Sequence, residues 1–177
     1  MTGSPQGRRI LIAIVTGEVG EKIQAWRTIN DPEEAIRLPP HTTLCYWAPT
    51  VEPELLEQQV RHAFPAPITV HLGEVHEFEN REQTFFIEVG DTEALDAARE
   101  VLYDGSIVEL PRDRNWIWHV TCVRRSTGRD RAELQAALAG FSVDAPWTID
   151  TIAYMELRGN IYETIAEWKL APAAVTR

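Results

Sequence analysis

Two short motifs contain the residues whose types and spacing are suited to chemistry. The first pairs His41 with Thr43, and the second pairs His119 with Thr121. Residues two apart in an extended strand point to the same face, so each motif places an imidazole beside a hydroxyl. Because imidazole titrates near pH 6.5, one histidine can accept a proton while the other donates one. Threonine hydroxyls can hydrogen-bond the oxygens on which transition-state charge collects. This set predicts acid–base cleavage of a phosphate ester, with no metal and no cofactor.

The motifs occupy equivalent places in an internal repeat. An apolar strand pattern precedes each motif, at residues 10–15 and 84–89. A helical pattern follows each motif, and then an Ala-Pro-x-Thr sequence begins a further strand, at 66–69 and 145–148. The repeated order of strand, helix, His-strand, helix, strand predicts an α+β fold. We expect a bilobal internal duplication, with antiparallel sheets, outer helices and a central groove that carries both motifs.

The repeat also predicts the domain organisation. We expect a single domain over residues 1–177, with repeat units at roughly 8–80 and 81–160 and a closing strand at 161–170. A turn signal at 158–160 favours a hairpin before that last strand. At this length, folding removes roughly 70% of the surface of the unfolded chain, so stability requires neither a metal nor a disulfide.

At these residues the sequence resembles the 2H phosphoesterase superfamily, which includes the 2′-5′ RNA ligase-like proteins and the 2′,3′-cyclic phosphodiesterases. Its hallmark is a spaced pair of His-x-(Thr/Ser)-hydrophobic motifs in a bilobal fold. The resemblance implies that His41 and His119 form the acid–base pair, and that Thr43 and Thr121 orient the phosphoryl group. It also implies hydrolysis, or reversible ligation, of a small nucleotide or RNA-end phosphodiester. A 2′,3′-cyclic phosphate and a 2′-5′ linkage are the expected bonds, and the sequence leaves open which histidine is the acid.

Three more residues are candidates for substrate binding. Arg124 follows the second histidine by five positions, where the resemblance implies a phosphate-binding arginine. Tyr46 follows the first histidine by five positions, where the resemblance implies an aromatic residue. Strand alternation places both on the face opposite the histidines, so Arg124 requires a bulge or a strand end to reach phosphate. Trp118 is the third candidate, because an indole can stack on a nucleobase. The same alternation directs Trp118 toward the core, and it places Cys45 on the face of His41. For both Cys45 and Cys122 we expect a packing role.

The charge distribution favours a small anionic ligand. The chain has 17 Lys+Arg against 27 Asp+Glu, for a net charge of −10, which argues against long duplex nucleic acid. Between residues 112 and 131, arginines outnumber aspartates, which predicts a positive patch beside the second motif. The loops expected at 16–21 and 104–115 are candidate selectors of base and linkage. The remaining histidines are interpreted as surface or rim residues: His62, His71 and His76.

Other function classes are excluded or left open. The apolar run at 10–15 is too short for a membrane span or a secretory signal. With only two cysteines and an arginine-rich cation set, we expect a cytoplasmic bacterial protein, monomeric because one chain completes the groove. Two alternatives to the phosphoesterase remain. One is a nucleotide-binding module without turnover, and the other is an enzyme for another cyclic (oligo)nucleotide or a cyclic ADP-ribose phosphate.

Overall fold

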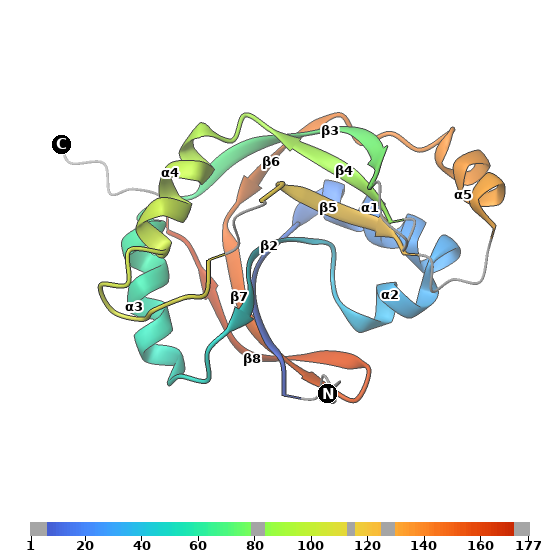
Figure 1. The fold of residues 1–177 in the computed structure, drawn as a ribbon. Helices are drawn as coiled ribbons and strands as arrows, with labels where there is room; N and C mark the ends of the chain where they lie inside the picture. Colours follow the sequence, from blue (N-terminus) through green and yellow to red (C-terminus); the bar gives the residue numbers. More distant parts are fainter. Residues whose placement is uncertain (1–6, 79–83, 113–115, 125–129, 172–177) are drawn as a thin grey trace.

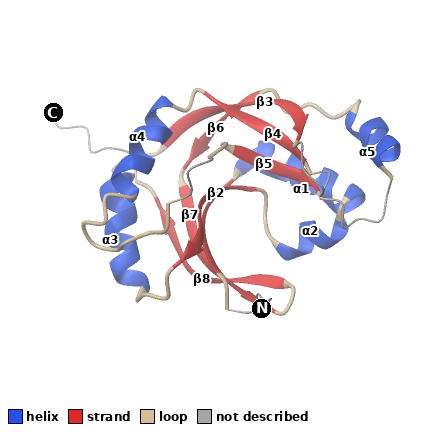
Figure 2. Ribbon diagram, viewed as in Figure 1, coloured by secondary structure: helices blue, strands red, loops and turns tan. Residues whose placement is uncertain are grey.

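Two four-stranded antiparallel sheets form the centre of the computed structural model, which describes residues 7–78, 84–112, 116–124 and 130–171 (Figures 1 and 2). The first sheet contains, in spatial order, β2 (His41–Ala48), β1 (Arg9–Ile14), β7 (Thr151–Arg158) and β8 (Ile161–Lys169). The second contains β5 (His119–Val123), β4 (Phe85–Gly90), β3 (Ile68–Glu77) and β6 (Ala145–Ile149). The helices are α1 (Gly17–Asn30), α2 (Pro32–Arg37), α3 (Pro53–Ala63), α4 (Glu93–Leu102) and α5 (Arg131–Leu138). Figure 1 shows α3 and α4 together at one end of the sheets and the other three helices at the other end. The expected α+β class is confirmed.

The element order follows the predicted duplication. β1, α1, β2, α3 and β3 are followed by β4, α4, β5, α5 and β6, and α2 is an additional helix between α1 and β2. The two sheets, however, do not correspond to the two repeat units that meet near residue 80. β3 pairs antiparallel with β4 and therefore belongs to the second sheet, while the β7–β8 hairpin completes the first sheet. Strands that follow one another in sequence tend to pair, and this preference acts across the boundary of the sequence repeat.

Helix α1 begins where the sequence predicted a loop. Residues 16–21 were expected to be irregular, yet the helix starts at Gly17, which has φ 70°. Few apolar residues indicate this helix, because the residues that it buries include Arg27 and Asn30. Gly20 is required by close packing, since a Cβ there would lie 2.1 Å from the carbonyl oxygen of Val15.

Two other helices begin at the residues that their sequence signals predicted. Pro53 occupies the first turn of α3, as expected for a residue with a fixed φ and no amide hydrogen. At α5, the Asp130 carboxylate accepts a hydrogen bond from the backbone amide of Glu133 at 2.8 Å, as its capping signal predicted.

Strand β1 is apolar on both faces because it is covered on both faces. Leu11 and Ala13 belong to the main core, which packs against both sheets and the helices. Ile10 and Ile12 face the opposite way, into a smaller apolar cluster with Leu38. This smaller cluster lies beneath the candidate site described below. No helix within the described ranges is long and apolar enough to cross a membrane.

Candidate active site

Both motif histidines stand at the first residue of an edge strand. His41 begins β2 and His119 begins β5, and these two edge strands lie next to each other where the two sheets meet (Figure 1). The duplication therefore brings the two motifs together in space. The histidines are close enough for the charge of His119 to lower the pKa of His41.

Each imidazole is held by the same local hydrogen bond. Nδ1 of His41 lies 2.7 Å from the carbonyl oxygen of Pro39, and Nδ1 of His119 lies 2.8 Å from that of Ile117. A carbonyl oxygen can only accept, so Nδ1 must carry a hydrogen in both rings. In the neutral ring, Nε2 is then the free basic atom, and in the charged ring it is the free acid.

The two environments differ in a way that the sequence did not show. His41 is 8% exposed, and burial lowers its pKa to about 3, with the charges of Arg27, His119 and Arg124 acting in the same direction. The pKa of His119 is also lowered, first by burial and then by the charge of Arg124. Since His119 is only half-buried, it is the easier of the two to protonate.

Strand β2 contains a one-residue register shift at the fourth position of its motif. Ile12 pairs with Thr43 but Leu11 pairs with Cys45, so Leu44 is an extra residue in β2. The Tyr103 hydroxyl donates a hydrogen bond to the carbonyl of this residue at 2.7 Å. A bulge of this kind reverses the alternation of the residues beyond it.

Strand β5 has the matching shift at the same motif position. Phe86 pairs with Thr121 and Phe85 pairs with Val123, so Cys122 is the extra residue. Arg124 follows the end of the strand, and the reversed alternation places it on the face of His119.

The two bulges correct three expectations drawn from strict alternation. Tyr46 and Arg124 both line the cavity that contains His41, instead of facing away from it. Cys45, which was expected on the face of His41, is fully buried in the main core. Cys122 is also fully buried, and burial raises the pKa of its thiol to about 12, in agreement with a packing role.

A cavity of about 80 Å³ lies at the first motif. Its walls contain three arginines, one carboxylate, three aromatic or imidazole rings, one hydroxyl and two aliphatic side chains. They are Arg8, Arg37, Arg124, Glu34, His41, Tyr46, Tyr162, Thr43, Ile10 and Leu38. His119 and Thr121 lie on the neighbouring strand β5, outside this lining. An arginine-rich cavity beside two imidazoles is suited to a phosphate group.

Sequence reasoning missed Arg8, Arg37 and Tyr162. Arg8 donates from Nε to the hydroxyl of Tyr162 at 2.8 Å, and the guanidinium carbons of Arg8 and Arg37 lie 5.8 and 5.7 Å from the Tyr162 ring centroid. Arg8 directly precedes β1, Arg37 ends α2 and Tyr162 lies in β8, so no local motif joins them. Neither residues 16–21 nor the described part of 104–115 lines this cavity, and their role in selecting base and linkage stays a prediction.

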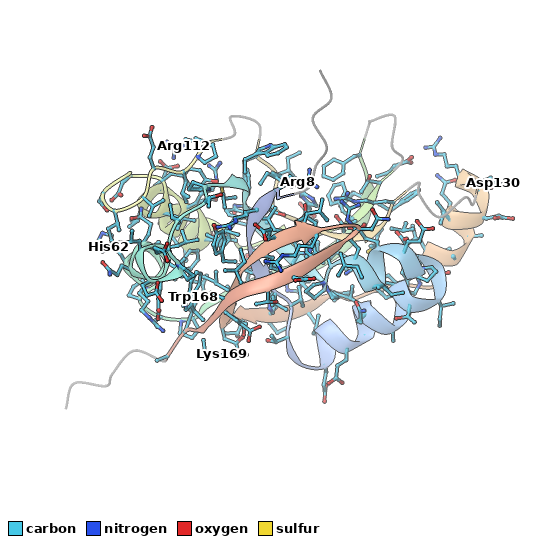
Figure 3. The ribbon with its side chains drawn as sticks, turned by 90° about the horizontal axis from the view of Figure 1, so that it is seen from below. Arg8, His62, Arg112, Asp130, Trp168 and Lys169 are labelled. Atoms are coloured by element: carbon cyan, nitrogen blue, oxygen red, sulfur yellow. The ribbon has the colours of Figure 1, made fainter. Side chains whose placement is uncertain are left out.

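The arginine-rich segment only partly forms the expected patch. Arg124 reaches the cavity, but Arg112 pairs with Glu100 and Arg131 pairs with Glu77. Figure 3 shows Arg112 far from Arg8, at the end of the molecule that also carries His62. Residues 113–115 and 125–129 lie outside the described ranges.

The other expected rim residues are mostly found where predicted. His71 pairs with Asp144, and His62 is exposed. His76 pairs with Glu88 at the rim of the second motif, because its ring lies 5.9 Å from that of Phe86, which in turn lies 5.6 Å from the His119 ring. Trp118 is 7% exposed, and its indole nitrogen donates to the carboxylate of Asp96 at 2.7 Å. We therefore assign Trp118 to the core and not to substrate binding.

A buried carboxylate joins the two halves of the site. The two carboxylate oxygens of Asp31 accept from the backbone amides of Glu34, at 3.3 Å, and of Arg124, at 2.8 Å. The Glu34 side chain in turn lies 3.5 Å from Nε of Arg124. Behind them Arg27, which is 1% exposed, donates to the carbonyls of Glu34 and Leu38. This network fixes the end of β5 against α2.

Metal-ligating side chains are not grouped in the described part of the chain, where no three His, Cys, Asp or Glu residues are arranged to hold a metal ion.

The comparison with known families agrees with this geometry. The family model of the 2'-5' RNA ligase superfamily matches residues 16–161. The chain belongs to this superfamily. Among curated proteins, no sequence matches this 2′-5′ RNA ligase superfamily member.

Solved structures share the fold of this superfamily member. E. coli LigT complexed with 3'-AMP is 18% identical, with a TM-score of 0.57, and the match covers 95% of this chain and 99% of LigT. TT0787 of Thermus thermophilus is 20% identical, with a TM-score of 0.61, and the match covers 94% of this chain and 99% of that protein. At these identities, the likeness establishes the fold and leaves the reaction to be argued from the site.

Proposed function

We propose that the protein is a metal-independent phosphoesterase that hydrolyses, or reversibly ligates, a small nucleotide or RNA-end phosphodiester. The proposed bond is a 2′,3′-cyclic phosphate or a 2′-5′ linkage. The observation that carries this proposal is the matched pair of Nδ1-anchored imidazoles, His41 and His119, beside a cavity that Arg124 lines. Superfamily membership supports a phosphodiester as the reacting group. A nucleotide-sized ligand agrees with the description of E. coli LigT as a complex with 3'-AMP.

The proposed mechanism uses the difference between the two histidines. Buried His41 is the neutral base, and its Nε2 removes a proton from water as the water oxygen attacks phosphorus. His119 is the acid, and its Nε2 gives a proton to the ribose oxygen as the P–O bond breaks. In the reverse direction the two groups exchange roles: His119 removes the proton of the attacking ribose hydroxyl, and His41 gives a proton to the departing water oxygen, so ligation and hydrolysis use the same pair.

The phosphoryl oxygens are assigned to hydroxyl and guanidinium donors. Thr43 and Thr121 share the faces of the two histidines and are proposed to hydrogen-bond the non-bridging oxygens. Arg124 offers a guanidinium in the cavity and is proposed to neutralise charge that grows on those oxygens. Tyr46, which also lines the cavity, is proposed to contact the sugar or base. The proposal retains the monomeric state and cytoplasmic location expected from the sequence.

The direct test is turnover of the four nucleoside 2′,3′-cyclic monophosphates in the presence of EDTA. Hydrolysis that persists under chelation supports the proposal, and the release of a 2′- or 3′-phosphate identifies the ester oxygen that leaves. Turnover that EDTA abolishes would contradict the metal-independent mechanism. Binding of these nucleotides without turnover would instead favour the non-catalytic binding module, or an enzyme for another cyclic oligonucleotide.

The pH profile of kcat/KM is expected to be bell-shaped, with its maximum on the acidic side of neutrality. A base acts only above its pKa, which is about 3 for His41, and an acid acts only below its pKa. The pKa of His119 is lowered from 6.5, so activity should fall as pH rises through a value below 6.5. A flat profile from pH 5 to 8 would contradict the assignment.

Arg124→Gln is expected to lower kcat/KM by about 10²-fold, because one cation is lost from the charged transition state. The same substitution should move the alkaline limb to higher pH, since the charge of Arg124 lowers the pKa of His119. Arg112→Gln is the matched control, because Arg112 pairs with Glu100 away from the cavity. Equal effects of the two substitutions would argue against a phosphate role for Arg124.

A further inference from the structure

A second, larger cavity adjoins the catalytic one, and the mechanism above does not use it. Its volume is about 490 Å³, and α2 and the turn of the β7–β8 hairpin form its sides. Its lining consists of Glu33, Glu34, Ile36, Arg37, Asn160 and Ile161. We call it the α2–hairpin groove.

The groove lies next to the catalytic cavity. Glu34 and Arg37 line both, so the two spaces meet at these side chains. The guanidinium of Arg37 lies 5.7 Å from the centroid of the Tyr162 ring, which belongs to the catalytic cavity. A ligand with its phosphate beside His41 would meet the groove on the far side of Arg37.

Size determines which part of a nucleotide fits each space. Small-molecule sites typically have volumes of about 300–1,000 Å³, so the catalytic cavity of about 80 Å³ is too small to enclose a whole nucleotide. A phosphate group is the part of a nucleotide that suits a cavity of this size. The groove, at about 490 Å³, falls within the range of ordinary ligand sites.

The groove lining is suited to a flat apolar ring with polar edges. Ile36 is 70% exposed and Ile161 is 46% exposed, and they come from two different elements, so one cavity brings two exposed isoleucines together. An exposed apolar surface with polar residues at its rim is typical of a ligand-binding groove. Asn160 and Glu33 add hydrogen-bonding groups at the rim.

We propose that the α2–hairpin groove binds the base of the nucleotide whose phosphate lies in the catalytic cavity. The planar base lies against Ile36 and Ile161, and the ribose passes Arg37. This inference rests on the proposed function. It specifies that the phosphodiester carries a nucleoside, and it assigns a site to the base.

The test compares two cyclic phosphates with the same reacting ring, one of which has no base. The substrates are adenosine 2′,3′-cyclic monophosphate and glycerol 1,2-cyclic phosphate. The measured quantity is kcat/KM for the adenosine substrate divided by kcat/KM for the glycerol substrate. Ile36→Ser and Ile161→Ser are each expected to lower this ratio by about tenfold, mainly by raising KM for the adenosine substrate. Ile29→Ser is the control, because Ile29 is 75% exposed and lines neither cavity, and it should leave the ratio within about twofold. Unchanged ratios in both groove variants would overturn the proposal.

Failure of the proposed function is distinguishable from failure of the groove. If neither cyclic phosphate is hydrolysed, binding of adenosine 3′-monophosphate is measured by calorimetry. A Kd that weakens about tenfold in Ile161→Ser but not in Ile29→Ser would still support the base site, whereas equal Kd values would overturn it. A change of molar mass in solution on Ile161→Ser would show that a second copy covers the groove, which also overturns the proposal.

Discussion

Replacing His41 or His119 by alanine is expected to lower kcat/KM on a 2′,3′-cyclic phosphate by about 10²–10⁴-fold in each case. Each substitution removes one proton-transfer group, and the remaining imidazole cannot be the base and the acid of the same step. His71→Ala is the matched control, because that strand histidine pairs with Asp144 on the outer surface. It should retain full activity. The measurement is steady-state hydrolysis with EDTA present, on variants whose thermal unfolding matches that of the wild type.

The pH profiles of the two variants should differ in opposite ways. His41→Ala should lose the acidic limb, because the base is gone, and His119→Ala should lose the alkaline limb, because the acid is gone. Profiles that lose the same limb would assign both steps to one histidine. Activity within about threefold of the wild type in either variant would remove the two-histidine mechanism altogether.

Asp31→Ala is expected to lower the free energy of unfolding by about 3 kcal/mol, because a buried amide left without a partner costs about 1–3 kcal/mol. The carboxylate satisfies two such backbone amides, those of Glu34 and Arg124. Asp31 is also the N-cap of α2, and the loss of this cap accounts for about 0.5–2 kcal/mol of the expected destabilisation. The substitution also removes one of the two carboxylates, Asp31 and Glu34, whose charges favour the charged form of buried Arg27.

Asp130→Ala provides an internal comparison. Asp130 caps α5 through the same bond to the third residue of its helix, but this bond is exposed, and among the described residues the Asp130 carboxylate holds no second backbone amide. Its loss should cost about 1 kcal/mol. Urea unfolding at constant m measures both values. Equal costs would show that the bond from Asp31 to Arg124 contributes nothing to stability.

Activity gives a second readout for Asp31. Because Asp31 holds the backbone of Arg124, the variant should weaken phosphate binding and raise KM at temperatures where it remains folded. Asp31→Asn keeps one side-chain oxygen, so both its stability and its KM should lie between those of the wild type and those of Asp31→Ala.

The amino-acid sequence by itself determined the elements and the pairing of the two motifs. Apolar alternation and the repeated Ala-Pro-x-Thr starts are local signals, and they place His41 and His119 at equivalent strand positions. No register shift falls between the histidine and the threonine of either motif, so each His–Thr pair shares a face as simple alternation predicts. Helix α1 was less visible, because buried Arg27 and Asn30 take positions where an apolar pattern would have indicated it.

Tertiary structure decided which other residues join the site. The register of β2 against β1 and of β5 against β4 inserts an extra residue directly after the threonine of each motif, and this turns Tyr46 and Arg124 toward the cavity and Cys45 away from it. Such a shift depends on the neighbouring strand, so alternation within one strand cannot reveal it. Arg8 and Arg37 reach the same cavity from separate elements that only the sheet order brings together. The difference between the two histidines likewise follows from burial, which is a property of the packed chain and not of the motif.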